Sequence, residues 1–208
     1  MTIEELYARA EAEGIEIDEV PMRELRAVSF PEGWVAIDPR KFETMTELKC
    51  ELAHEIGHCE TGSFYNIYSP FDLKEKCERK ACRRAAEILM PLAELRRVIR
   101  RSREIWALAD YFDVTQAFAV MALELYGDEL TREPHERPAI LSQLKRAKDL
   151  LPNPAPVQKP APAAAVKPAA ARSAADRQIA KNMQVLRRLG IITDNWRDDP
   201  LLNLPDWL

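Results

Sequence analysis

Apolar residues recur along the first part of the chain with the periods of helices and of short strands. Residues 2–13 carry an apolar stripe of helical period, which predicts an amphipathic helix. Three β-prone segments follow, separated by prolines: residues 15–20, 27–30 and 33–37. We expect these three segments to form a small sheet.

Helical patterns dominate from residue 44 onward. Thr44 and Glu47 match a capping box, and the helix that they begin runs into LAHEIGHC at 52–59. Ser69, followed by a proline and an acidic residue, predicts the start of another helix, which ends near Met90. Further helices are expected in two stretches: 92–112 and 115–126.

The character of the sequence changes after Gly127, which we interpret as a helix stop. Residues 128–172 are a predicted linker, Pro/Ala-rich from about 152, where six of the chain's fifteen prolines lie within 17 residues. Residues 173–208 combine a predicted helix with an apolar tail. We therefore expect an α+β domain at 1–127, mainly helical with a small N-terminal β-sheet, then a tether and a C-terminal helix.

The composition is that of a globular protein. Of 208 residues, 47% are hydrophobic and 31% charged, and no apolar run approaches the roughly 18 residues of a bilayer span. The N-terminus is acidic and amphipathic rather than a signal peptide, so we expect a cytoplasmic protein without a membrane partner. The net charge of −4 argues against general nucleic-acid binding. Residues 71–103, however, hold five acidic and eleven basic side chains, which we interpret as a solvated basic face.

The chain contains four cysteines without any Cys-x-x-Cys pair: Cys50, Cys59, Cys77 and Cys82. That spacing fits neither a thiolate zinc site nor a redox motif. Since nothing else indicates secretion, we expect free buried thiols.

The segment LAHEIGHC places two of the chain's three histidines four residues apart, with a glutamate between them. On a helix, His54 and His58 share one face, so both imidazoles can reach one zinc ion. Glu55 lies beside that face, where it can accept a proton from a metal-activated water without binding the ion. His-Glu-x-x-His is the signature of zinc peptidases, so we predict a metal site with Glu55 as the catalytic base.

A catalytic zinc usually has three protein ligands, so a further ligand is needed. Glu78 is the best candidate, because small residues follow it on the same helix face and permit the close approach of two helices. Cys77, Cys82 and His135 remain alternatives on chemical grounds. Zn²⁺ is the expected ion, although other divalent metals fit two histidines and a carboxylate.

Four stretches together resemble the ImmA/IrrE family of zincin-like metallopeptidases: GWVAID (33–38), LAHEIGHCETGSFYN (52–66), ERKACRRAAEILMP (78–91) and the helical segment 105–127. The resemblance implies that His54, His58 and Glu78 bind the metal and that Glu55 is the base. It also implies a protein substrate, a helix-turn-helix repressor of a phage, mobile-element or stress-response locus. One position departs from the family pattern: Cys82 stands where an Asp or Asn usually orients a ligating histidine.

The predicted reaction is hydrolysis of a peptide bond, which also needs a donor to stabilise the oxyanion. Tyr65, Tyr68 and Arg83 are the candidates for that role or for substrate contacts. The edge of the 33–37 strand is expected to take an extended substrate segment.

Two other functions compete with the peptidase hypothesis. A non-cleaving antirepressor would bind the repressor without turnover. A DNA-binding regulator fits less well, because residues 115–126 offer mainly Gln116 to base edges and are otherwise those of a core helix.

Overall fold

The protein is described by a computed structural model, in which residues 1–130 apart from 67 and 103 are placed. The elements in chain order are α1 (Ile3–Ala12), β1 (Glu16–Glu19), β2 (Ala27–Phe30), β3 (Trp34–Ile37), a 3-10 turn η1 (Pro39–Lys41), α2 (Met45–Thr61), α3 (Phe71–Leu89), α4 (Leu92–Ile99), α5 (Ile105–Phe112), α6 (Gln116–Leu125) and α7 (Gly127–Leu130). The predicted C-terminal helix, nearly all of the predicted linker and His135 lie outside the described residues.

The sheet is small and lies in the N-terminal part of the chain. Its order is β1-β3-β2, with β3 parallel to β1 and antiparallel to β2. All four residues of β3 are buried, as expected for a central strand. The prediction that this strand has a free edge is therefore wrong: both of its edges are paired, and β1 and β2 are the outer strands of the sheet.

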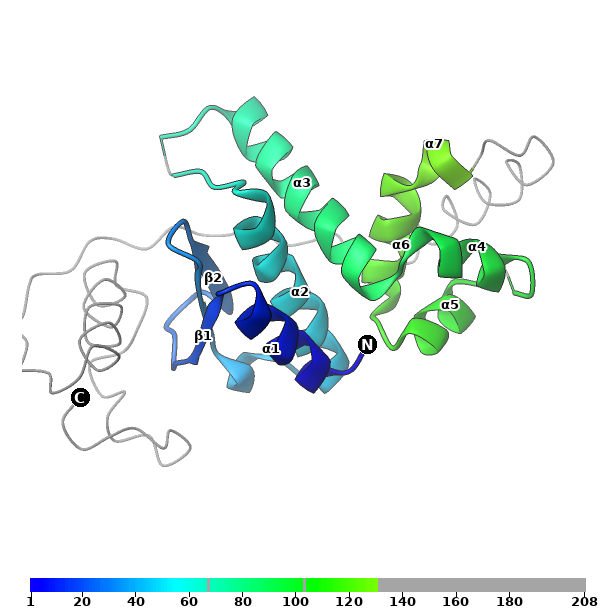
Figure 1. Ribbon diagram of the computed structural model, residues 1–208, viewed down its shortest axis with the longest axis horizontal. Helices are drawn as coiled ribbons and strands as arrows, with labels where there is room; N and C mark the ends of the chain where they lie inside the picture. The colour runs from blue at the N-terminus through cyan, green and yellow to red at the C-terminus, as the bar shows by residue number, and fades with distance from the viewer. Residues whose placement is uncertain (67, 103, 131–208) are drawn as a thin grey trace, which may run out of the picture.

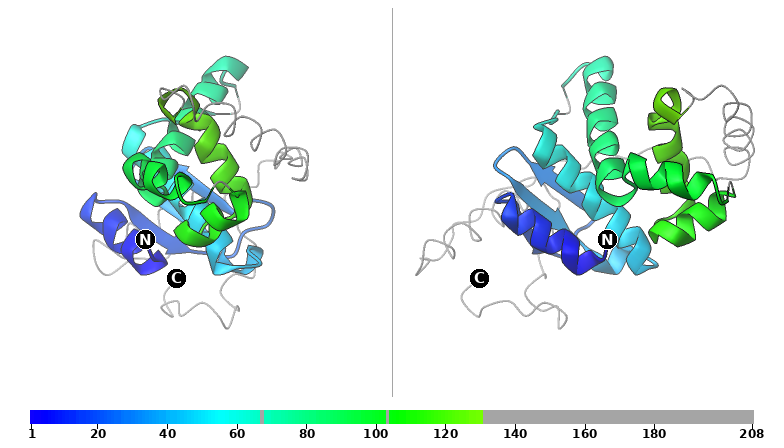
Figure 2. Two further views of the ribbon diagram at one scale, coloured as in Figure 1. Left: turned by 90° about the vertical axis from the view of Figure 1, so that its right-hand side faces the viewer. Right: turned by 45° about the vertical axis from the view of Figure 1, so that its right-hand side comes forward.

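Helices α2 and α3 lie at the centre of the molecule (Figure 1). The sheet and α1 are on one side of this pair, and α4–α7 are on the other, as the rotated views also show (Figure 2). One apolar core runs through both halves, from Leu6 of α1 to Leu123 of α6. The predicted α+β class, mainly helical, is confirmed. The buried side chains of α6 also confirm that it is a core helix.

Helix boundaries follow the sequence signals with three exceptions. Thr44 caps α2 by accepting from the Glu47 amide, but the Glu47 carboxylate turns to the Glu43 amide instead of closing the predicted box. Ser69 does not cap α3, because its hydroxyl bonds within the preceding turn, at Asn66. Gly127, the predicted helix stop, is instead the first residue of α7.

The predicted helix over 92–112 is wrong as a single element, since α4 ends at Ile99 and α5 begins at Ile105. The intervening segment is basic and has no apolar residue to bury between the two helices. Ser102 accepts a hydrogen bond from the Glu104 amide at 3.4 Å, which offers the backbone an alternative to the helix.

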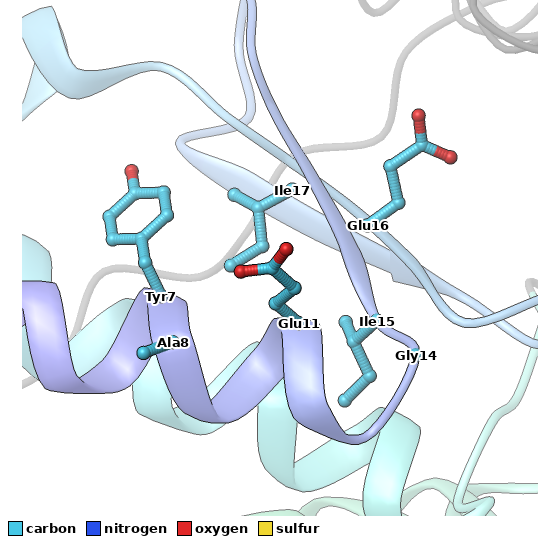
Figure 3. A pocket seen from close by; sticks show the side chains of 7 residues that line it. All are labelled: Tyr7, Ala8, Glu11, Gly14, Ile15, Glu16 and Ile17. Carbon is cyan, nitrogen blue, oxygen red and sulfur yellow. The ribbon is translucent and has the colours of Figure 1, made fainter. Parts of the chain in front are cut away.

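Helix α1 packs beside β1 and leaves a shallow hollow between them, into which Tyr7 and Glu11 of the helix project (Figure 3). Tyr7 donates to Glu19 at 2.7 Å and so ties the helix to the strand. No helix in the described part of the chain has both the length and the apolar character needed to cross a membrane.

Candidate metal centre

The centre is built where α2 and α3 cross. At Gly57 of α2, an added Cβ would lie 2.5 Å from the carbonyl oxygen of Ala81, so only glycine allows this approach. Ala81 and Ala85, the small residues of α3 that suggested close packing, are fully buried. The predicted close approach of the two helices is present, and it brings Glu78 up to the histidine pair.

His54, His58 and Glu78 converge on one point. The Nε2 atoms of the two histidines are 3.2 Å apart. The Glu78 carboxylate lies 3.2 Å from Nε2 of His54 and 3.5 Å from Nε2 of His58. Three corners of a tetrahedron with bonds of about 2.0–2.1 Å to a central ion are separated by about 3.3–3.4 Å, so this donor set fits a zinc-sized ion.

The second nitrogen of each imidazole has its own neighbour, which holds the ring in place. His58 Nδ1 lies 2.6 Å from the carbonyl oxygen of Ser63, because Gly62 in the left-handed conformation ends α2 and turns the chain back. His54 Nδ1 lies 3.5 Å from Cys82 Sγ. With Nε2 facing the ion, each Nδ1–H can donate to these groups, the arrangement that orients metal-ligating histidines in proteins.

Cys82 also offers a sulfur ligand, since ligand atoms of His54, Glu78 and Cys82 lie within 4.8 Å of one another. However, its contact is with Nδ1 of His54, whereas the other imidazole and the carboxylate face Nε2. The geometry therefore favours Cys82 as a neighbour of His54 rather than as a further ligand. All four cysteines are free thiols, as predicted, but only Cys50 and Cys77 are buried, whereas Cys59 and Cys82 are half-buried.

The electrostatics of the cluster favour positive charge among these groups. Burial lowers the pKa of His54, but hydrogen bonds with Cys82 and Glu78 outweigh burial and raise this pKa to about 11. Burial raises the pKa of Glu78, but hydrogen bonds from His54, His58 and Tyr65 hold it far below its usual value. A site that stabilises positive charge in this way is suited to a cation.

Glu55 lies next to His54 on α2, and only 7% of it is exposed. Among the described residues, no donor forms a hydrogen bond to its carboxylate. A buried carboxylate without a hydrogen-bond donor, beside the candidate metal centre, has its oxygen atoms free to accept a proton.

The candidates for oxyanion stabilisation lie in different surroundings. Tyr65 reaches the cluster, because its hydroxyl donates to Glu78. Tyr68 is 88% exposed at the outside of the same loop. Arg83 is bound elsewhere, to the Leu125 carbonyl at 2.9 Å and to Glu129 at 2.6 Å. Cys77 is buried against the carbonyl of Phe64, at 3.6 Å.

One part of the centre escaped the sequence reasoning. The Ser63 carbonyl is a backbone group, which no side-chain pattern can reveal, although Gly62 signals the turn that positions it. Cys82, in contrast, lies beside a histidine at the position where the resemblance expects a group that orients one. Cys82 lies one helical turn after Glu78 and therefore on the same face of α3.

Comparison with known families agrees with this geometry. Residues 29–124 match the model of a peptidase family, M78, described as the IrrE N-terminal-like domain. The match begins within β2 and ends within α6, so it includes α2, α3 and all residues of the candidate metal centre. No curated protein and no solved structure gives a significant match. Residues 29–124 are therefore similar to the IrrE N-terminal-like domain of a peptidase family, which agrees with the resemblance that the motifs indicated.

Proposed function

We propose that the protein is a zinc-dependent endopeptidase that cuts a helix-turn-helix repressor and so relieves repression. The observation that carries this proposal is the spacing of 3.2–3.5 Å among the two Nε2 atoms and the Glu78 carboxylate. We assign His54, His58 and Glu78 as the metal ligands and Glu55 as the catalytic base.

A divalent ion held there would lower the pKa of water and polarise the carbonyl of the scissile bond. Glu55 would take the proton of the attacking water and pass it to the leaving amine. Tyr65 is the favoured oxyanion donor, because it alone of the three candidates has its hydroxyl at the cluster. When the Tyr65 hydroxyl no longer donates to Glu78, it can donate to the carbonyl oxygen of the substrate instead.

The outer edge of β2 is the proposed place for the substrate backbone. β2 packs against α2, and the carbonyl of Phe30 at its end lies 4.0 Å from the Cys59 sulfur of that helix. An extended peptide added to this edge would run close to the histidine helix. The aromatic residues Tyr65, Tyr68 and Phe71 are all exposed on the loop and helix start that follow the cluster, where they can contact apolar substrate side chains.

The decisive experiment compares the wild type with Glu55→Gln, using as substrates small helix-turn-helix repressors, first of all any that is encoded next to this chain. Intact-mass spectrometry should find two fragments whose masses sum to that of the repressor plus one water. Glu55→Gln should bind the same amount of zinc and yield no fragments. Glu75→Gln, the same change at an exposed position of α3, is the control and should cleave normally.

Undiminished cleavage by Glu55→Gln would reject the assignment of the base. If the wild type releases the repressor from its operator while the repressor keeps its full mass, the protein is a non-cleaving antirepressor instead.

A further inference from the structure

A basic groove lies on the face of α3 that is turned away from the histidines, and it is distinct from the metal centre. It has a volume of about 620 Å³ and is bordered by the end of α2 and by Leu125 of α6. Five basic side chains line it, against a single acidic one, Glu87: Lys76, Arg79, Lys80, Arg83 and Arg84.

The charge of this groove is only partly neutralised by the domain itself. Arg83 and Arg84 form ion pairs with glutamates, including Glu87. Lys76, Arg79 and Lys80 are exposed, and none of the three forms an ion pair within the part of the chain that the structure describes. Uncompensated positive charge therefore remains along little more than one turn of α3.

The groove is not purely polar. Leu73, which is 45% exposed, and Leu125 contribute apolar surface, and Cys77 lies at its base. Because apolar side chains and unpaired cations lie side by side in the groove, it fits a peptide in which large apolar residues alternate with acidic residues. A phosphate backbone would use the cations but leave the leucines uncovered.

We propose that the occupant is residues 194–208 of this same chain. Their sequence, DNWRDDPLLNLPDWL, contains four aspartates and one arginine together with six large apolar residues. It thus offers negative charge to the unpaired cations of the groove and apolar side chains to its leucines. No other stretch outside the described residues combines the two features: 131–149 carries many basic residues and 150–172 has no acidic one.

The point where the described chain ends favours binding within one molecule. The described chain ends at Leu130. The residue before it, Glu129, forms an ion pair with Arg83 at the rim of the groove. The 63 residues from 131 to 193 can span far more than the width of the domain at about 3.3 Å per extended residue. A tethered ligand has an effective concentration that makes even weak contacts count. This inference does not depend on the proposed peptidase function.

Hydrogen–deuterium exchange on the full-length protein tests the proposal. Amides within 194–208 should exchange more slowly than those of a synthetic peptide of the same sequence. The groove variant Lys76→Glu/Arg79→Glu/Lys80→Glu should lower the protection factor of these amides by about tenfold. Each exposed ion pair contributes modestly to binding, and the variant reverses the charge of three cations at once. The control Arg23→Glu/Arg100→Glu/Arg101→Glu changes the charge equally at exposed arginines away from the groove and should keep the protection.

A second variant guards against a folding defect in the first. Asp198→Lys/Asp199→Lys/Asp206→Lys alters only the tail and should also abolish protection, whereas combining it with the groove variant should restore protection in part. Equal exchange in the wild type and the free peptide would overturn the proposal. So would protection that persists in both variants, or protection that rises with protein concentration, which would show that the groove binds the tail of a second copy.

Discussion

Gly57 of α2 lies so close to Ala81 of α3 that a Cβ on the glycine would be 2.5 Å from the alanine carbonyl oxygen. Gly57 directly precedes His58, and Ala81 lies three residues after Glu78, so this contact joins the two helices beside the candidate metal centre. The glycine of the His-Glu-Ile-Gly-His segment therefore sets the distance between the helices, and with it the distance between histidines and carboxylate.

Gly57→Ala should push α3 away from α2, because the obstacle is backbone and cannot rotate aside. We expect a loss of about 1–3 kcal/mol in the free energy of unfolding and weaker zinc binding. Urea unfolding and competition with a chromophoric chelator measure the two effects. Gly127→Ala is the matched control, since a Cβ there meets no atom within 4 Å. Equal behaviour of the two variants would contradict the proposed spacing role.

Cys82→Asp should tighten zinc binding, whereas Cys82→Ala should weaken it. A carboxylate accepts the Nδ1–H of His54 more strongly than sulfur does, and alanine does not accept it at all. Changes in such partners alter metal affinity by about 10–100-fold. Chelator competition on the three proteins is the measurement. If Asp and Ala variants bind zinc equally well, the sulfur contact at 3.5 Å does not orient the histidine.

Glu60→Gln should destabilise the fold without affecting zinc binding directly. The side chain of Glu60 is 6% exposed and joins three helices: it accepts from Arg9 of α1 at 2.8 Å and also from Arg84 of α3. Hydrogen bonds to charged groups contribute about 1.5–3 kcal/mol, so a loss in this range is expected in urea unfolding. Glu13→Gln, at an exposed site after α1, should leave stability unchanged.

Asp38 should make the stability of the domain sensitive to acid. Burial raises the pKa of Asp38, but hydrogen bonds from Arg40 and the Met22 amide outweigh burial and hold this pKa below its usual value. Its contribution is therefore complete above the unfolded-state pKa of about 3.9 and disappears as the pH falls through the lower folded-state pKa. Urea midpoints between pH 7 and pH 2 should fall less steeply for Asp38→Asn than for the wild type. Parallel curves would show that another group is responsible.

Several features of the fold could be predicted because they depend on local sequence. The strand Ala27–Phe30 and the cap of α2 at Thr44 follow from short-range propensity and hydrogen bonding. The split between α4 and α5 was missed, because periodicity alone does not show that a basic segment has nothing to pack against. Strand order was also out of reach. The position of β3 between its neighbours depends on pairing across the chain.

The sequence by itself determined the donor chemistry: a histidine pair on one helix face, a glutamate beside it, and a further carboxylate on a helix lined with small residues. Helical spacing is local, so residue types four positions apart suffice to predict it. The tertiary structure alone decided which side chains meet. It brought Glu78 to the imidazoles, turned the Ser63 carbonyl and Cys82 toward their second nitrogens, and held Arg83 in contacts with α6 and α7. These contacts join residues from separate elements, and they depend on how closely and at what angle the helices pack.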